Sequence, residues 1–242
     1  MPNEDAPVTV EFDAVYRGEI AGDTGIPFDF APWDIGEPQP RVVEREREGQ
    51  FRSEVLDAGC GRGDHSLYLA ERGYQVTGFD FSSSAIEQAR ERASAAGLPV
   101  EFLVTDATRL DGLEQRFTTV LDSALYHCLS NEQRPAYAAA LHRVTLPGAE
   151  LNLLCSADVE HPGVKMPMRE TTDNLRTHLS EHWDIQTIEF DRYTTALTTE
   201  FLKTLDPSDL HELDAGADID SVVTDDQGRV RIPVWRLHAV RR

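Results

Sequence analysis

The sequence contains no long hydrophobic run and very little lysine. No stretch of 18 or more apolar residues occurs in the 242-residue chain, so we expect no membrane-spanning helix. Lysine occurs only at Lys165 and Lys203, and 23 basic residues stand against 43 acidic ones, which gives a net charge of −20. A strongly negative field disfavours nucleic acid and anionic membrane surfaces, because their phosphates need cationic partners. The composition therefore predicts a small-molecule substrate, with neither nucleic acid nor membrane as a partner.

Cysteine is scarce as well, and no pattern of metal ligands is present. Cys60, Cys128 and Cys155 are widely spaced and form no C-x-x-C pair, which favours buried or turn-lining thiols over a disulfide or a metal site. Histidines and carboxylates show no metal-binding spacing such as H-E-x-x-H. The acidic first residues lack the pattern of a secretion signal, so we expect a cytoplasmic location. Our default expectation for assembly is a monomer or a weak homodimer.

The excess of acidic residues over lysine also suggests a protein adapted to high salt. Many like charges repel one another in the folded chain, and dissolved salt screens this repulsion. We therefore expect the melting temperature to be higher in molar salt than in dilute buffer. A fully folded protein with the same melting temperature in both would contradict this hypothesis.

The most informative stretch is residues 55–82, VLDAGCGRGDHSLYLAERGYQVTGFDFS. An apolar strand leads to three glycines at alternate positions, Gly59, Gly61 and Gly63, and an expected helix and second strand follow, ending at Asp80. Glycine permits a sharp turn and the close approach of a ligand. An acidic residue after the second strand can accept hydrogen bonds from ribose hydroxyls. The stretch therefore predicts half of a nucleotide-type binding site.

The glycine spacing indicates which nucleotide to expect. Dinucleotide sites use G-x-G-x-x-G, whereas this turn reads G-x-G-x-G and has Asp64 where the third glycine would stand. A carboxylate there repels a pyrophosphate but not the cationic sulfonium of S-adenosylmethionine (SAM). The D-A-G-C-G-R-G turn with Asp80 downstream closely resembles the first two motifs of the class I SAM-dependent methyltransferases. Two alternatives stay open, namely an NAD-dependent oxidoreductase and a non-catalytic SAM-binding module.

The resemblance implies a set of contacts to SAM, whose product would be S-adenosylhomocysteine. Asp57 and the turn after it would hold the methionine part, Asp80 would bind the ribose, and Phe81 would lie beside the adenine. Asp106 and the backbone of Ala107 would bind the adenine nitrogens. The negative charge of aspartates at the strand ends suits the positive end of the cofactor. The implied cofactor-binding positions are Trp33, Asp57, Ala58, Gly59, Cys60, Gly61, Asp80, Phe81, Asp106, Ala107 and Asp122.

A rigid aromatic segment, residues 28–40, precedes the first strand. Its P-W-D-I-G-x-P-Q-P sequence resembles a segment of small-molecule methyltransferases related to thiopurine and halide/thiol methyltransferases. In that family the tryptophan lies over the methionine end of the cofactor, and Trp33 is the matching residue here. An aromatic face also stabilises a sulfonium cation. We therefore expect residues 1–50 to form an N-terminal lid on a methyltransferase domain at 51–242, within a single domain overall. The alternative is a loop that only buries Trp33 in the core.

The loop after the fourth expected strand contains the candidate catalytic residue. In the family this loop borders both the methyl group and its acceptor, and here it contains His127. Histidine titrates near neutral pH, so His127 is the candidate general base, with a buried packing role as the alternative. Tyr126 is a second candidate base or a pocket wall, and Met166 and Met168 are candidate walls of the acceptor pocket. The methyl acceptor stays open among a thiol, a phenolic or N-hydroxy oxygen, and a halide.

Strands and helices alternate along the chain and predict a doubly wound α/β sheet. The family has seven mostly parallel strands in the order 3-2-1-4-5-7-6, with the seventh antiparallel. Helices are expected near residues 11–19, 41–50, 83–96, 131–145 and 171–180, and further strands at 100–104, 117–121, 151–156, 183–193 and 230–240.

Three finer expectations concern the surface and the end of the chain. The helix at 41–50 is charge-dense, which predicts a solvated face. The inner face of the helix at 83–96 is expected to include Arg90. Residues 200–220 are expected to form an acidic peripheral insertion, and a hairpin is expected around residues 226–228.

Overall fold

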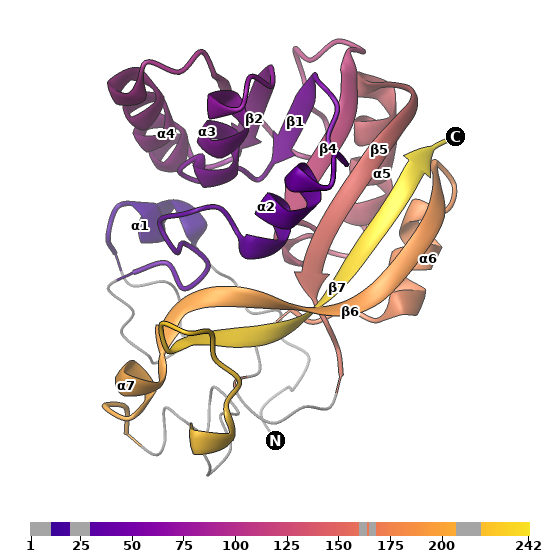
Figure 1. The fold of residues 1–242 in the computed structure, drawn as a ribbon. Coiled ribbons are helices and arrows are strands. Elements are labelled where there is room, and N and C mark those ends of the chain that lie inside the picture. The colour runs from indigo at the N-terminus through magenta and orange to yellow at the C-terminus, as the bar shows by residue number, and fades with distance from the viewer. Residues whose placement is uncertain (1–10, 20–29, 160–163, 165–167, 207–218) are drawn as a thin grey trace.

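A computed structural model of the chain describes residues 11–19, 30–159, 164, 168–206 and 219–242 (Figure 1). The strands are β1 (Val55–Ala58), β2 (Val76–Asp80), β3 (Glu101–Val104), β4 (Phe117–Ser123), β5 (Thr145–Ser156), β6 (Trp183–Thr198) and β7 (Arg229–Arg241). They form one sheet in the order β3-β2-β1-β4-β5-β7-β6, in which β7 runs antiparallel to both of its neighbours. The predicted doubly wound fold, its strand order and its antiparallel seventh strand are confirmed.

Helices cover both faces of this sheet (Figure 1). They are α1 (Phe12–Tyr16), α2 (Pro40–Arg47), α3 (Asp64–Glu71), α4 (Ser83–Ala96), α5 (Gln133–Val144), α6 (Thr172–Leu179) and α7 (Thr199–Leu202), with short 3-10 turns η1 (Tyr126–Cys128) and η2 (Ile219–Ser221). No helix in the described part of the chain is long and apolar enough to cross a membrane.

Side chains alternate in direction along a strand, so neighbouring residues pack against helices on opposite faces of the sheet. Val55 and Leu121 pack in one cluster with Val42 of α2 and with side chains of α3. Leu56 and Val120, one position away, pack instead with α5 and α6. Both faces of the central strands are therefore buried, which explains why β1 and β2 are buried at every position.

The register of the parallel strands brings the predicted site residues to one edge of the sheet. Ala58, the last residue of β1, pairs with Phe79 of β2 on one side and with Asp122 of β4 on the other. The glycine turn after β1, Asp80 at the end of β2 and the loop after β4 consequently lie side by side. Ligands of open α/β sheets bind at the carboxyl ends of the strands, as this arrangement requires.

β6 and β7 continue past the other strands as a long two-stranded arm (Figure 1). Beneath it lies a separate apolar cluster that includes Tyr193, Leu197 and Ile232. Phe30 and Trp33 from the segment ahead of β1 pack against this cluster. The arm therefore supports the segment that the sequence predicts to be a lid.

One expectation about the surface is wrong, and two others are confirmed in part. Arg90 is exposed and donates to the carbonyl oxygen of Phe102, so it does not belong to the inner face of α4. α2 has the expected solvated face, but Val42 and Arg45 on its other side are buried. The expected hairpin around residues 226–228 is present as a turn with one antiparallel bridge, between Thr224 and Val230, and its second arm is β7, which also pairs with β6 and β5. Most of the expected acidic insertion lies outside the described residues.

Candidate functional site

The turn after β1 is built from glycines whose backbone conformation excludes other residues. Gly59, Gly61 and Gly63 have φ of +66°, +52° and +82°, a region that L-residues with a side chain rarely adopt. The turn is fixed to the next strand, because the N–H of Cys60 donates to the carbonyl oxygen of Phe79 at 2.9 Å. A Cβ atom added at Gly61 would lie 2.6 Å from the hydroxyl of Tyr16. Tyr16 can therefore pack directly on the turn only because Gly61 lacks a side chain.

Asp80 is held in place by the backbone on either side of it. Its Oδ2 accepts the N–H of Gly61 and its Oδ1 accepts the N–H of Ser82, each at 2.9 Å. Each carboxylate oxygen has a second lone pair, so both still have capacity to accept a ribose hydroxyl. Burial raises the pKa of this carboxyl group, whereas the two backbone hydrogen bonds lower it. The side chain thus has the position and the acceptors that the resemblance assigns to it.

The short helix α1, which the sequence predicted within the expected lid segment, covers this turn. Asp13 accepts hydrogen bonds from Ser82 Oγ at 2.6 Å and from the N–H of Ser84 at 3.0 Å, so it binds the start of α4. The carbonyl oxygen of Tyr16 accepts a hydrogen bond from Gln88 of α4. These contacts fix the hydroxyl of Tyr16 above Gly61. The sequence signal for this contact was the apolar face of the helix, which carries two aromatic residues.

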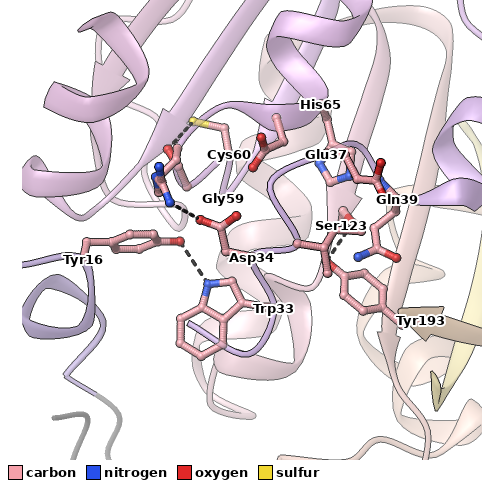
Figure 2. Close-up of a pocket in the computed structure, with 14 residues that line it drawn as sticks. Tyr16, Trp33, Asp34, Glu37, Gln39, Gly59, Cys60, His65, Ser123 and Tyr193 are labelled. Atoms are coloured by element: carbon pink, nitrogen blue, oxygen red, sulfur yellow. Dashed lines mark hydrogen bonds and ion pairs between the residues drawn. The ribbon is translucent and has the colours of Figure 1, made fainter. Parts of the chain in front are cut away.

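Aromatic rings from three separate segments meet above the site. The ring centroid of Phe12 lies 5.3 Å from that of Trp33 and 6.1 Å from that of Phe81. Trp33 Nε1 donates to the Tyr16 hydroxyl at 3.1 Å (Figure 2). Phe81 keeps 56% of its surface exposed beside the end of β2. An exposed ring at that position leaves a face available for a flat ligand such as adenine.

The segment at 30–39 is fixed at both of its ends to distant parts of the chain. The carbonyl oxygen of Pro32 accepts the N–H of Ala196 in β6. The Gln39 side chain donates to the carbonyl oxygen of Thr194 at 2.8 Å and accepts its N–H at 3.1 Å, so it pairs with β6 as a strand would. Between these anchors Asp34 forms an ion pair with Arg62 of the glycine turn at 3.0 Å. The segment therefore lies across the end of the sheet.

These elements enclose a pocket that opens in part to solvent. The residues lining it are Tyr16, Trp33, Asp34, Ile35, Glu37, Gln39, Gly59, Cys60, Gly61, Arg62, Asp64, His65, Ser123 and Tyr193. Figure 2 shows Trp33 and Tyr16 at one end and Tyr193 with Ser123 at the other. The wall opposite the turn comes mainly from residues 33–39, within the aromatic segment that the sequence singled out. Tyr16, Ser123 and Tyr193 complete it, and none of these three was predicted to be a site residue.

The polar end of the pocket contains a phenol, a hydroxyl and an imidazole. Ser123 Oγ donates to the Tyr193 hydroxyl at 3.5 Å, and burial raises the pKa of Tyr193 to about 12. His65 Nε2 accepts the N–H of Gln39 at 3.2 Å, which leaves the other ring nitrogen to carry the proton in the neutral form. These groups are suited to orienting a polar acceptor by hydrogen bonding.

Asp57 and Asp122 do not line the pocket, although both lie directly beneath it. Asp57 is 1% exposed and its Oδ2 accepts a hydrogen bond from Ser66 at 2.6 Å. Asp122 is fully buried and accepts hydrogen bonds from the N–H groups of Leu125 and Tyr126 and from the Tyr137 hydroxyl. Burial raises the pKa of Asp122 to about 7. The expected full negative charge of both aspartates therefore needs correction, because Asp122 is partly protonated at neutral pH.

The residues predicted to bind the adenine, Asp106 and Ala107, follow the end of β3. Asp106 Oδ1 accepts hydrogen bonds from the N–H and the hydroxyl of Thr108, which is the turn role that the sequence also allowed. Ala107 is buried just after it, and both follow the end of β3, next to β2. The Asp64 carboxylate forms an ion pair with Arg92 at 2.6 Å. Its repulsion of a pyrophosphate is therefore weaker than the sequence argument assumed.

His127 is partly buried and turned toward the end of β5. Its Nδ1 accepts the N–H of Ser156 at 3.2 Å, and burial lowers its pKa to about 4. It does not appear among the described residues that line the pocket. Tyr126 is fully buried, and its hydroxyl donates to Asn174. The arrangement favours the packing alternative for His127. Met166 lies outside the described residues.

The cysteines form no disulfide and belong to no metal site within the described residues. Cys60, Cys128 and Cys155 are free thiols, as predicted. Burial raises the pKa of each of them. No group of three potential metal ligands occurs within the described ranges.

Comparisons with known proteins agree with this geometry. Residues 55–148 match a family model described as a methyltransferase domain. The chain is 35% identical over 182 residues to 2-heptyl-1-hydroxyquinolin-4(1H)-one methyltransferase of Mycobacteroides abscessus, covering 73% of this chain and 78% of that protein. It is 28% identical over 125 residues to a probable thiol methyltransferase of Arabidopsis thaliana, covering 50% of this chain and 54% of that one.

Solved structures extend the similarity to the whole fold. One solved structure concerns the conversion of a disulfide bond into a thioacetal group during echinomycin biosynthesis. It is 33% identical to this chain with a TM-score of 0.73, and the match covers 95% of this chain and 91% of that one. Magnesium protoporphyrin IX methyltransferase from Synechocystis, solved with bound SAM, shares the fold at 18% identity and a TM-score of 0.55, covering 84% and 76%. The sheet and its glycine turn define a Rossmann-like enzyme with a nucleotide-type cofactor. The chain belongs to the class I SAM-dependent methyltransferases, and its cofactor is SAM.

Proposed function

We propose that this enzyme transfers a methyl group to an acidic hydroxyl or thiol of a small, largely aromatic molecule. The observation that carries the proposal is the single pocket that joins the glycine turn at Gly59 to the hydrogen-bonding groups of Ser123 and Tyr193, beneath Trp33. The aromatic wall of this pocket suits a flat ring, and its polar end suits one or two oriented hydrogen bonds.

Two relatives support this class of acceptor. The relative from Mycobacteroides abscessus is named for a hydroxyquinolone, in which the hydroxyl is attached to a ring nitrogen. The structure at 33% identity is connected with a reaction at the sulfur atoms of a disulfide. Both acceptors present an oxygen or sulfur nucleophile. We therefore place an N-hydroxy heterocycle or a thiol ahead of the phenolic and halide acceptors that the sequence left open.

The residues present fit SAM, whose sulfonium carries the transferable methyl group. We assign the ribose hydroxyls to Asp80, the adenine to the exposed face of Phe81, and the methionine end to the glycine turn below Trp33. Cβ atoms added at Gly59 and Gly61 would lie 2.9 Å from Leu125 and 2.6 Å from the Tyr16 hydroxyl. Glycine at these two positions therefore lets Leu125 and Tyr16 pack close against the turn. The chain's remaining task is to align the acceptor and exclude water.

The proposed acceptor reaches the site already ionised. Neither His127, with a pKa of about 4, nor Tyr193, with a pKa of about 12, is a suitable base at neutral pH. N-hydroxy and thiol groups are acidic enough to supply their own anion, whereas an ordinary alcohol is not. Alignment and desolvation then provide the catalysis, with Ser123 and Tyr193 orienting the nucleophile. Residues 30–39 act as the proposed lid of a single domain.

The experiment that tests this function compares acceptors directly. The purified enzyme is incubated with SAM and, separately, with an N-hydroxyquinolone, an aromatic thiol, a phenol and an aliphatic alcohol, and S-adenosylhomocysteine formation is measured. We expect turnover with the first two and little with the alcohol. A protein that binds SAM but methylates none of these would support the non-catalytic alternative and contradict the proposal.

The pH profile of methyl transfer is expected to follow the acceptor and not His127. kcat/KM should rise with the pKa of each acceptor as its midpoint, so the midpoint moves when the acceptor is changed. His127→Asn keeps an acceptor for the Ser156 N–H and removes the titrating ring, so we expect kcat/KM to stay within about threefold. A loss of 100-fold or more with an unchanged fold would restore His127 as the general base.

A further inference from the structure

An ion pair between the segment at 30–39 and the glycine turn crosses the middle of the pocket. Oδ2 of Asp34 lies 3.0 Å from Nη1 of Arg62, and Oδ1 of Asp34 accepts the N–H of Gly36 at 2.9 Å. Burial is the main cause that raises the pKa of Tyr16 and of Tyr193, and the charge of Asp34 raises both further. Asp34 therefore lies between the two ends of the pocket, as Figure 2 also shows.

Arg62 has hydrogen-bonding capacity that the protein itself does not use. It is the only arginine or lysine among the described residues that line the pocket. Nη1 is its only guanidinium atom with a hydrogen bond to another described residue, and Nε is buried without a partner. A guanidinium carries five N–H donors in a planar fork, so Arg62 can bind a second carboxylate in addition to that of Asp34.

The other permanently charged groups on the pocket wall are carboxylates. Glu37 and Asp64 line the pocket, and each pairs with an arginine that does not, at 2.6 Å from Arg229 and 2.6 Å from Arg92 respectively. An anionic group of a ligand would be repelled by either carboxylate if it lay beside it. Within the described wall, Arg62 is therefore the position that favours a negative charge most.

SAM carries one anionic group, the carboxylate of its methionine tail, in addition to its ammonium and sulfonium groups. We propose that Arg62 binds this carboxylate while it stays paired with Asp34, so that a ligand with an intact tail connects the segment at 30–39 to the glycine turn. The inference rests on the proposed placement of the methionine end at the glycine turn below Trp33. Its consequence is specificity, because a ligand without the carboxylate loses this contact.

A purely structural ion pair is the competing explanation. In that case Arg62 only fastens the segment at 30–39 to the turn and makes no contact with the ligand. Removing the pair would then weaken every adenosine ligand by the same factor. If Arg62 binds the carboxylate, the loss falls on ligands that have a carboxylate and largely spares those that lack one.

The test compares two ligands that differ only in the carboxylate. Calorimetric titrations measure the affinity of the unmodified protein for S-adenosylhomocysteine and for its decarboxylated analogue, which keeps the thioether and the amino group. We expect S-adenosylhomocysteine to bind about 30-fold more tightly, the size expected for hydrogen bonds between charged groups. Equal affinities for the two ligands would overturn the proposal.

The double variant Asp34→Asn/Arg62→Met shows whether Arg62 causes this preference. It leaves no unpaired carboxylate in the pocket, and it keeps the net charge at −20, so the general field acts on both ligands as before. The preference for S-adenosylhomocysteine should fall to about threefold or less. A preference of tenfold or more that persists in the folded double variant would contradict a contact between Arg62 and the carboxylate.

Two single variants serve as controls. Asp34→Asn keeps Arg62 and should keep the preference, whereas its loss there would assign the effect to Asp34 and overturn the role of Arg62. Arg229→Met releases Glu37, the other carboxylate of the segment at 30–39 that pairs with an arginine, and Arg229 does not line the pocket. Both ligands can bind more weakly to Arg229→Met, but their ratio should stay at about 30-fold. A lost preference in Arg229→Met would show that loosening the segment suffices and would overturn the proposal.

A structure of the unmodified protein with S-adenosylhomocysteine separates this inference from the assignments on which it rests. A carboxylate within hydrogen-bonding distance of the Arg62 guanidinium would support it. A methionine tail at the glycine turn whose carboxylate contacts only backbone N–H groups would overturn the role of Arg62 and leave the placement of the tail intact. A tail directed elsewhere would overturn both. No methyl acceptor takes part in any of these measurements, so they do not depend on the proposed acceptor class.

Discussion

Asp122→Asn is expected to remove a pH dependence of stability worth about 3 kcal/mol between pH 5 and pH 8. The pKa of Asp122 is raised by burial to about 7 in the folded protein, from an ordinary value of 3.8. The folded state therefore favours the protonated carboxyl. That contribution to stability is complete below about pH 4 and is lost as the pH rises through 7. Asparagine mimics the protonated form, because it keeps an oxygen for two backbone N–H groups and can donate to Tyr137.

The free energy of unfolding is measured in urea at several pH values, for the unmodified protein and for Asp122→Asn. The unmodified protein should lose stability relative to Asp122→Asn as the pH rises. Asp106→Asn is the control, since hydrogen bonds from Thr108 lower the pKa of this exposed carboxyl and its effect should have the opposite sign. Parallel stability curves for the unmodified protein and Asp122→Asn would show that Asp122 is ionised throughout.

The ionisation of Asp122 is also expected to make the affinity for SAM depend on pH. A cation bound above the sheet edge favours the ionised form of Asp122, so SAM should bind more tightly as the pH rises from 6 to 8. S-adenosylhomocysteine lacks the sulfonium charge and should show a weaker dependence. Calorimetric titrations of both ligands at three pH values measure the difference. Identical pH dependences for the two ligands would argue against any influence of Asp122 on the sulfonium.

Gly61→Ala is expected to weaken SAM binding about 100-fold, which is about 3 kcal/mol. The loss of affinity comes from displacing Tyr16, since the new Cβ would lie 2.6 Å from its hydroxyl oxygen. The left-handed backbone conformation adds a cost of about 1–2 kcal/mol to folding stability. Displacement of Tyr16 also breaks its hydrogen bond to Trp33 and so opens the aromatic cover.

A second substitution identifies the cause of that loss. Tyr16→Phe removes the hydroxyl, after which the nearest ring atom would lie 3.4 Å from the new Cβ. SAM affinity should therefore recover about tenfold in the double variant relative to Gly61→Ala alone. Gly73→Ala is the matched control, because its φ is +86° and no atom lies within 4 Å of the added Cβ. It should lower stability without changing SAM affinity. No recovery in the double variant would place the cause in the backbone alone.

The fold was predictable because its signals are local or belong to a known family. The boundaries of α4 follow from Ser82 and Gly97, which cap the helix as predicted. The strand order followed from the resemblance, and the alternation of strands and helices supported it. Burial of Arg45 could not be predicted, because the charge-dense sequence of α2 gives no sign of the polar residues on the strands beneath it.

The cofactor side of the site was accessible from the sequence, whereas the acceptor side was not. Glycines and Asp80 form a compact motif with a fixed spacing, so their proximity follows from the strand–turn–helix pattern. Tyr193 and Gln39 reach the pocket only because β6 folds back over the chain, a contact between residues 155 positions apart at Gln39 and Thr194. The role of His127 stays a prediction, because its position at the sheet edge does not reveal from sequence that its Nδ1 accepts the N–H of Ser156.

The anchoring of the lid to β6 has a consequence for the order of folding. β6 joins the sheet only through β7, which is the later of the two strands along the chain. Gln39 can form its hydrogen bonds with Thr194 of β6 only after β7 has paired with β5. The segment at 30–39 therefore docks after the C-terminal strands have joined the sheet. Such a long-range closure is slow, because its loop entropy is lost before its contacts form. We infer that the half-site at β1 and β2 assembles first, and that the cofactor is enclosed in the final step of folding.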